Sequence, residues 1–228
     1  MSKGVFITGT GTDVGKTYVS ALLLGSMLEA GYSCGYYKAA LSGASSFEES
    51  DAGFVKRFAK LSQTEDTLLS YRYRAPVSPH LAAQWEGNPV CIEKIRYDYA
   101  AVCGEYPFVV VEGSGGIVCP LRWEETEHIL QEDIVTELAL PTLVVADAGL
   151  GTINASVLTV HYLKSRNIPI KGIVLNHFTG TAMQNDTAKM IEELTGVPIL
   201  AFVKENDQTL SLSKDRLEML FAEVIPCA

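Results

Sequence analysis

The sequence predicts an open, doubly wound α/β fold built on a mainly parallel sheet. Short apolar runs, rich in β-branched residues, alternate along the chain with longer amphipathic segments. Such runs belong to strands that are buried on both faces, and their alternation with helical patterns is typical of parallel βαβ units. No internal repeat or linker interrupts the pattern, so residues 1–228 are expected to form a single domain. In this fold, functional residues lie beyond the carboxyl ends of the strands.

The apolar runs and the amphipathic segments give the expected elements in order. The expected strands are Gly4–Thr8, Ser33–Lys38, Phe108–Glu112, Thr142–Asp147, Ile170–Asn176 and Val197–Val203. The expected helices are Thr17–Glu29, Ser50–Leu61, Ile92–Val102, Gln131–Leu138, Asn154–Ser165 and Gln184–Leu194. The last helix is followed by Gly196, a typical helix stop. The stretch Ala75–Asn88 is rich in proline and turn residues, which predicts a long loop over one edge.

Composition argues against several classes of partner. The formal net charge is -9 and no run of lysine and arginine is present, which argues against a nucleic-acid partner. No apolar stretch approaches the ~20 residues of a membrane span, and no signal peptide precedes the first strand. The cysteines are scattered without a CxxC pair, as in a protein with reduced thiols. They are Cys34, Cys91, Cys103, Cys119 and Cys227. We therefore expect a cytoplasmic protein with neither a nucleic-acid nor a membrane partner.

The strongest motif is the glycine-rich segment Gly9–Thr17, which we call the phosphate loop. It follows the first strand directly and opens the first helix. Glycines allow backbone N–H groups to point inward around a phosphate chain, and the helix N-terminus adds partial positive charge. Lys16 is placed to reach the β- and γ-phosphates, and the Thr17 hydroxyl is placed to ligate Mg²⁺. Thr10 stands where the usual spacing requires glycine, so this P-loop is a lengthened variant.

A dinucleotide-binding turn is the main alternative for this loop. That motif requires an acidic residue at the end of the second strand to bind a ribose, and Lys38 stands there instead. A glycine turn without any ligand would not require the Lys16-Thr17 pair. The motif therefore predicts a P-loop NTPase-like site for a nucleoside triphosphate and Mg²⁺.

Three further segments offer cations and metal ligands. Lys38 falls at the end of the second strand, where a lysine reaching out to solvent is the alternative interpretation. Asp51 begins a helix, as a metal ligand or as an acid favoured by the helix dipole. Glu112 ends an apolar strand, where an acid is costly unless a cation pairs with it, so a functional role is favoured. Asp147 ends the next strand, and turn closure and metal contact are equally compatible with its position.

Taken together, these segments resemble the ATP-dependent dethiobiotin synthetase family. The resemblance runs from Thr8 to about Asn176. The matching motifs are Gly9–Thr17, Lys38 with Ser42-Gly43, Ser50-Asp51-Ala52, Ala75–Ala83, Glu112–Gly116 with Pro120-Leu121, Gly151–Asn154, and Asn176. The resemblance implies a reaction in which 7,8-diaminopelargonate and CO₂ form a carbamate, which ATP phosphorylates. The second amine then closes a cyclic urea, with release of ADP and phosphate.

The resemblance also implies roles for individual residues. Lys16 and Lys38 would be catalytic, and Thr17, Asp51 and Glu112 would hold Mg²⁺. The implied nucleotide-binding residues are Asp13, Val14, Gly15, Lys16, Thr17, Tyr18, Asp51, Glu112, Gly113, Ser114, Gly115 and Asn176. The implied substrate-binding residues are Thr12, Lys38, Ser42, Gly151, Thr152, Ile153 and Asn154. The last four open a helix and would take the substrate carboxylate across the interface of a homodimer.

The sequence departs from the family pattern at two places. Ala39 stands where proline usually follows the strand lysine, which changes loop rigidity more than chemistry. The segment Leu200–Asp207 lacks the family's Gly-x-Ile/Leu-Pro turn before the residues that touch the base. We therefore hypothesise weak selectivity for the nucleotide base.

Two alternative functions share a P-loop. A regulatory or partitioning ATPase would have a second lysine early in the loop and a membrane-targeting tail. The early loop Thr10–Asp13 contains no lysine, and the segment Val224–Ala228 is neither basic nor amphipathic. A cobyrinate-type amide synthetase would need an additional glutaminase domain, for which 228 residues leave no room.

Overall fold

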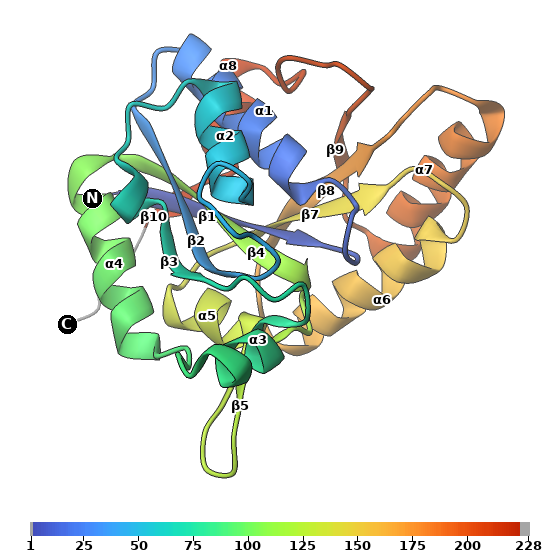
Figure 1. The fold of residues 1–228 in the computed structure, drawn as a ribbon. Coiled ribbons are helices and arrows are strands. Elements are labelled where there is room, and N and C mark those ends of the chain that lie inside the picture. Colours follow the sequence, from blue (N-terminus) through green and yellow to red (C-terminus); the bar gives the residue numbers. More distant parts are fainter. Residues whose placement is uncertain (1, 224–228) are drawn as a thin grey trace.

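The computed structural model describes residues 2–223 and contains one large twisted sheet (Figure 1). The predictions drawn from Cys227 and from Val224–Ala228 lie outside the described residues. Seven strands are parallel in the order β3-β2-β4-β1-β7-β8-β9, and the short β10 pairs antiparallel with the start of β1. The strands are β1 (Lys3–Gly9), β2 (Cys34–Leu41), β3 (Leu69–Arg72), β4 (Phe108–Gly116), β7 (Thr142–Asp147), β8 (Ile170–Asn176), β9 (Ile199–Phe202) and β10 (Ala222–Glu223).

Helices cover both faces of this sheet, which confirms the predicted doubly wound α/β class. One face is covered by α1 (Lys16–Glu29), α2 (Asp51–Ala59) and α8 (Lys214–Met219). The other is covered by α3 (Pro79–Glu86), α4 (Ile92–Glu105), α5 (Gln131–Glu137), α6 (Thr152–Ser165) and α7 (Ala182–Thr195). Each strand and helix expected from the sequence overlaps one of these elements.

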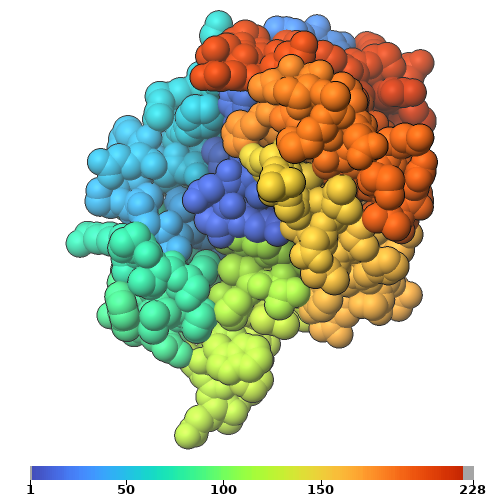
Figure 2. Space-filling view, turned by 90° about the vertical axis from the view of Figure 1, so that its right-hand side faces the viewer, coloured from blue at the N-terminus to red at the C-terminus, as the bar shows by residue number. Residues whose placement is uncertain are grey.

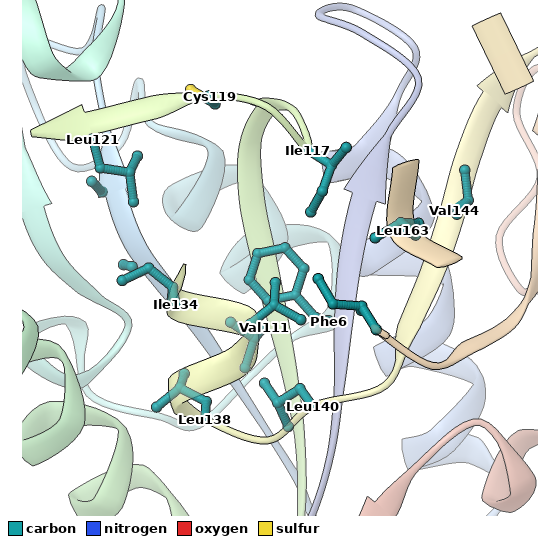
Figure 3. Close-up of a cluster of buried hydrophobic side chains, with 14 of the residues drawn as sticks. Phe6, Val111, Ile117, Cys119, Leu121, Ile134, Leu138, Leu140, Val144 and Leu163 are labelled. Atoms are coloured by element: carbon teal, nitrogen blue, oxygen red, sulfur yellow. The ribbon is translucent and has the colours of Figure 1, made fainter. Parts of the chain in front are cut away.

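Alternation along the strands divides the core into two apolar layers. Phe6 of β1 and Val111 of β4 point toward α5, where they meet Ile134 and Leu138 (Figure 3). Their strand neighbours point to the opposite face, against α1. Because the central strands are buried on both sides, their carboxyl ends are held rigidly at one edge of the sheet.

The stretch Ala75–Asn88 is not the long loop expected from its composition, because it contains α3. Ser78 precedes the first helical residue, and Pro79 takes the position where its fixed φ and missing N–H cost nothing. Gly87 ends the helix with a φ of 64°. A short apolar face with Ala82 and Ala83 then packs into the core. The proline and glycine mark the two ends of a helix rather than an irregular segment.

Two strands also extend beyond their predicted ends. β2 continues to Leu41, so Lys38 lies inside the strand, and β4 continues from Glu112 to Gly116. The sequence pattern missed β3, α8, β10, the 3₁₀ turn Glu65–Thr67, and a hairpin that projects from the body of the molecule (Figures 1 and 2). The hairpin consists of β5 (Pro120–Trp123) and β6 (His128–Leu130). Within residues 2–223, no helix is long and apolar enough to cross a membrane.

Candidate active site

The phosphate loop, Gly9–Thr17, curls between the end of β1 and the first turn of α1. A Cβ on Gly9 would lie 2.8 Å from Val14 Cγ2, so this curl requires glycine. Gly15 has a φ of 91°, and a Cβ there would lie 2.0 Å from Asn176 Nδ2. The Asn176 amide donates a hydrogen bond to the Val14 carbonyl at 3.1 Å. The end of β8 therefore fixes the last turn of the loop.

The side chain of Lys16 folds back into this loop. Its Nζ donates to the Gly11 carbonyl at 3.1 Å, and the residue is only 7% exposed. Burial lowers the pKa of Lys16, and the nearby Lys38 ammonium lowers it further. The Glu112 and Asp51 carboxylates oppose this shift, and Lys16 forms no ion pair among residues 2–223, so its ammonium is the group placed to meet a phosphate in the loop.

Lys38 lies at the centre of a buried charge cluster. Its Nζ donates to Asp51 Oδ2 at 2.6 Å and to Glu112 Oε1 at 2.7 Å. Glu112 and Lys38 are direct neighbours across β4 and β2, which explains how two strands bring the charges together. The Thr17 hydroxyl also donates to Glu112 Oε1, at 2.8 Å. The cation that a buried Glu112 requires is thus Lys38.

The cluster favours the charged forms of Lys38 and Asp51. Burial alone would lower the pKa of Lys38, but the Glu112 and Asp51 carboxylates outweigh it and raise that pKa. Burial would raise the pKa of Asp51, yet the Lys38 ammonium holds it below its usual value. The Lys38 side chain is 3% exposed and that of Glu112 is fully buried, so water screens this ion pair little.

A cleft of about 590 Å³ opens above this cluster. Its wall contains many of the site residues predicted from the sequence, and these residues belong to four separate segments of the chain. Those that line it are Thr12, Asp13, Lys16, Lys38, Ser42, Asp51, Ser114 and Gly115. In the space-filling view, the blue N-terminal surface that includes the phosphate loop lies in the middle of one face (Figure 2). Thr17 and Glu112 lie beneath the cleft rather than in its wall.

The donor set of Thr17, Asp51 and Glu112 fits Mg²⁺. It consists of one hydroxyl and two carboxylates, and oxygen is the donor that Mg²⁺ prefers. Within residues 2–223, no group of three or more histidine, cysteine or acidic side chains forms a complete metal cage. Mg²⁺ usually keeps several waters and binds one or two carboxylates together with substrate phosphates, so this incomplete set is what a nucleotide-bound ion requires.

The predicted carboxylate site, Gly151–Asn154, lies in a different hollow of about 480 Å³. Gly151 has a φ of 92° and precedes the 14-residue helix α6. Thr152 is 6% exposed, and its Oγ1 has no hydrogen-bond partner in the described part of the chain. The hollow is bordered by three exposed apolar side chains, Leu150, Leu158 and Leu194. Within one subunit, the structure does not bring this site into the Lys38 cleft.

Asp147 closes a turn, which is one of the two roles considered for it. Its Oδ1 accepts a hydrogen bond from the Gly149 N–H at 2.6 Å. Its Oδ2 contacts His177 Nδ1 at 2.5 Å. These contacts account for both carboxylate oxygens without a metal.

Two supporting residues were not predicted from the sequence. The hydroxyl of Tyr36 donates to Glu112 Oε2 at 2.9 Å. Gln131 is 2% exposed, accepts a hydrogen bond from the Ser114 N–H, and donates to the Gly116 carbonyl at 3.0 Å. Side chains alternate between the two faces of a strand, and Tyr36 precedes Lys38 by two residues. The sequence could therefore have indicated that the two side chains lie on the same face of the sheet. No local signal distinguishes Gln131 from other polar residues at the start of a helix.

The fold and the site define a P-loop NTPase-like α/β protein. Solved structures with this fold include the MinC:MinD cell division protein complex of Aquifex aeolicus, with a TM-score of 0.58 and 16% identity. That match covers 91% of this chain and 83% of the other. A ParA family ATPase from Chlorobium tepidum TLS has a TM-score of 0.54 and 13% identity, with 96% and 89% covered. Similarity at this level establishes the fold alone.

Closer relatives define the family. A family model described as an AAA domain matches residues 3–211. The chain is 48% identical to the ATP-dependent dethiobiotin synthetase BioD of Brachyspira hyodysenteriae, over 97% of this chain and 100% of that protein. It is 40% identical to the protein of the same name from Clostridium botulinum, over 98% of this chain and 100% of that protein. The chain therefore belongs to the ATP-dependent dethiobiotin synthetase family of ligases, which confirms the resemblance noted in the sequence.

Proposed function

We propose that this protein catalyses the ATP- and Mg²⁺-dependent ring closure of 7,8-diaminopelargonate with CO₂ to dethiobiotin. The observation that carries the proposal is the convergence of Lys16 and Lys38 on one cleft, beside the oxygen donors of Asp51, Glu112 and Thr17. A partitioning ATPase is disfavoured, because the ParA family ATPase is only 13% identical to this chain and shares the fold alone, whereas the BioD protein of Brachyspira hyodysenteriae is 48% identical.

The reaction proceeds in three steps. One amine nitrogen attacks the carbon of CO₂ and loses a proton, which gives a carbamate. A carbamate oxygen attacks the γ-phosphorus of ATP and displaces ADP, which gives a carbamic–phosphoric anhydride. The second amine then attacks the carbonyl carbon, loses a proton and expels phosphate, which closes the cyclic urea.

The residues of the cleft supply charge and position for these steps. Lys16 neutralises the charge that develops on the transferred phosphoryl group. Lys38 steadies the anionic carbamate close to that group. Thr12 and Ser42, which line the same cleft, face the diamine. Thr17, Asp51 and Glu112 would hold Mg²⁺, which would neutralise phosphate charge.

The nucleotide is bound mainly by the main chain. The N–H groups from Asp13 to Thr17 surround the phosphates at the N-terminus of α1. Tyr18, in the same helix turn, and the strand-end loop Gly113-Ser114-Gly115 complete the walls around the nucleotide. Asn176 holds the loop from the side through its hydrogen bond to the Val14 carbonyl, and it completes the nucleotide-binding set.

The substrate carboxylate binds across the interface of a homodimer. The N-terminus of α6, Gly151–Asn154, receives the carboxylate of a substrate whose reacting end lies in the neighbouring subunit's cleft. The buried, unpartnered hydroxyl of Thr152 supports an anion here, because burial without a partner costs free energy. The exposed Leu150, Leu158 and Leu194 support contact between subunits.

An isotope assay tests the proposed reaction. The protein is incubated with diaminopelargonate, ¹⁴C-labelled bicarbonate, ATP and Mg²⁺, and the products are separated by chromatography. We expect label in a cyclic urea and one equivalent of ADP for each urea. ADP formation without a labelled urea would contradict the assignment.

A further inference from the structure

Tyr36 is a buried core tyrosine whose hydroxyl has one hydrogen-bond partner among residues 2–223, the Glu112 carboxylate. It lies on β2, is fully buried, and faces the same side of the sheet as Lys38. Its main chain is held on both sides by Gln63: the Tyr36 N–H donates to Gln63 Oε1 at 2.8 Å, and Gln63 Nε2 donates to the Tyr36 carbonyl at 2.9 Å. The Tyr36 main chain is therefore held by contacts outside the charge cluster, and its ring packs in the apolar layer that includes α1.

The two carboxylate oxygens of Glu112 have different partners. Oε1 accepts hydrogen bonds from Thr17 and Lys38, on the side of the proposed metal site. Oε2 accepts a hydrogen bond from the Tyr36 hydroxyl, its one donor among the residues that the structure describes. Since the Glu112 side chain is fully buried, water cannot replace a missing donor there. Tyr36 therefore sets the rotation of the carboxylate group.

We propose that Tyr36 is a positioning residue that holds Glu112 with Oε1 presented to Mg²⁺. The inference rests on the proposed function, which places Mg²⁺ beside Thr17, Asp51 and Glu112. A phenol is suited to this task because it orients the carboxylate without neutralising it. Lys38 and Thr17 contact only Oε1, so the Tyr36 hydroxyl is the contact that fixes the second oxygen of the carboxylate. Loss of such a supporting hydrogen bond typically weakens metal binding ~10–100-fold.

The adjacent residue provides a matched control. Tyr37 is also fully buried in β2, but it faces the opposite side of the sheet, where its hydroxyl contacts Ser70 and the Ile95 carbonyl. The test compares Tyr36→Phe and Tyr37→Phe, each of which removes one buried hydroxyl and its hydrogen bonds. Mn²⁺ binding in the presence of ADP is measured by electron paramagnetic resonance, and urea unfolding is measured in parallel.

We expect Tyr36→Phe to bind Mn²⁺ at least ~10-fold more weakly than wild type, while Tyr37→Phe binds it normally. Both variants should lose some resistance to urea, so stability alone would not separate them. Replacing Tyr36 with 4-aminophenylalanine, which restores a donor at the same place, should recover most of the affinity. Recovery of Mn²⁺ affinity in this variant would show that the loss in Tyr36→Phe is caused by the missing donor and not by misfolding.

Three outcomes would overturn the inference. Unchanged Mn²⁺ affinity in Tyr36→Phe would overturn it and leave the proposed function intact. An equal loss of affinity in both variants would show that general destabilisation is responsible. A wild-type protein that binds no Mn²⁺ in the presence of ADP would overturn both the inference and the proposed metal site.

Discussion

Lys38 is the residue at which stability and proposed function are most closely linked. A lysine that is 2% exposed needs its carboxylate partners, because an isolated buried charge is strongly unfavourable. The pairing with Glu112 and Asp51 keeps the ammonium protonated and aimed at the cleft. A substitution of Lys38 would therefore leave both the Glu112 and the Asp51 carboxylates without their cation.

Replacing Lys38 with alanine should reduce turnover far more than nucleotide affinity. The loss of one cation from the site of phosphoryl transfer corresponds to a ~10²–10³-fold fall in kcat. The variant should also be destabilised by about 3–5 kcal/mol, because Glu112 loses its buried partner. Steady-state kinetics, nucleotide titration and urea unfolding measure these effects.

Lys94→Ala is the control for that substitution. Its ammonium is 47% exposed and forms a surface pair with Asp98, so its removal should alter neither kcat nor stability by a large amount. A Lys38→Ala enzyme that turns over at a rate near wild type would refute the role assigned to Lys38.

Cys119, in the wall of the cleft, should make stability depend on alkaline pH. Burial raises the pKa of its thiol from 9.0 to about 11, although the Lys16 and Lys38 ammonium groups oppose the shift. The folded state thus holds the proton more tightly, so this contribution to stability is complete below pH 9 and is lost as pH rises to about 11.

The Cys119→Ala variant isolates this effect. Between pH 9 and 11, the free energy of unfolding of the wild type should fall more steeply than that of the variant. The difference should accumulate to roughly 2–3 kcal/mol. Parallel pH profiles for the two proteins would show that the thiol is not shielded as the structure indicates.

At the scale of elements, periodicity predicted most of the sheet and the placement of its functional edge. Apolar runs identified the central strands, and the glycine-rich loop after β1 was placed correctly at the start of α1. α3 was missed because its proline and glycine were interpreted as loop residues rather than as the two ends of a helix. The strands at the margins, β3 and β10, are too short to show a period.

The supporting contacts of the site could not be predicted from local sequence. Gln131 contacts Ser114 and Gly116 from a helix that follows them by more than a dozen residues. A Cβ on Gly113 would lie 2.6 Å from the Gln131 amide nitrogen, so the two positions depend on each other. Such pairs depend on how α5 packs under β4, which only the folded structure reveals.

The segment that follows β9 should confer weak selectivity for the nucleotide base. The segment Leu200–Asp207 lacks the family's proline turn, and the residues that follow β9 are hydrogen-bonded to α1. Tyr18 donates to the Asp207 carbonyl at 2.5 Å, and the Leu210 N–H donates to Ser26 Oγ at 2.8 Å. Turnover with ATP, GTP and CTP should agree within about tenfold, the equivalent of one good hydrogen bond. A much stronger preference for ATP would contradict this prediction.

At the scale of the whole molecule, one fold serves chemically different proteins. The sheet resembles those of a cell division protein complex and of a ParA family ATPase at 13–16% identity, yet the relatives at 40–48% identity over nearly the full chain are named dethiobiotin synthetases. In this chain, the fold places the phosphate loop at the carboxyl edge of the sheet. The identity of the protein is determined by the residues around that loop.

Composite active sites predict that two inactive variants should complement each other. Lys38→Ala disables the cleft, and Thr152→Asp places a negative charge where the substrate carboxylate should bind. Thr152 is buried, so circular dichroism must first show that the Thr152→Asp protein is folded. In mixed dimers, one of the two sites combines an intact cleft with an intact α6 from the partner.

Mixing the two variants after mild dissociation should therefore restore activity, up to about half of wild type in each heterodimer. The same mixture assayed without subunit exchange serves as the control. If exchange is demonstrated and no activity returns, the carboxylate site and the cleft do not meet across an interface.

The most direct test of the account follows an oxygen atom from CO₂. If the carbamate oxygen attacks the γ-phosphorus, that oxygen leaves with the phosphate when the ring closes. The reaction is started with C¹⁸O₂ and stopped within seconds, before exchange with water, and the released phosphate is analysed by mass spectrometry. We predict one ¹⁸O atom in each phosphate; phosphate that carries no ¹⁸O, released alongside labelled dethiobiotin, would contradict the proposed chemistry of the Lys16–Lys38 cleft.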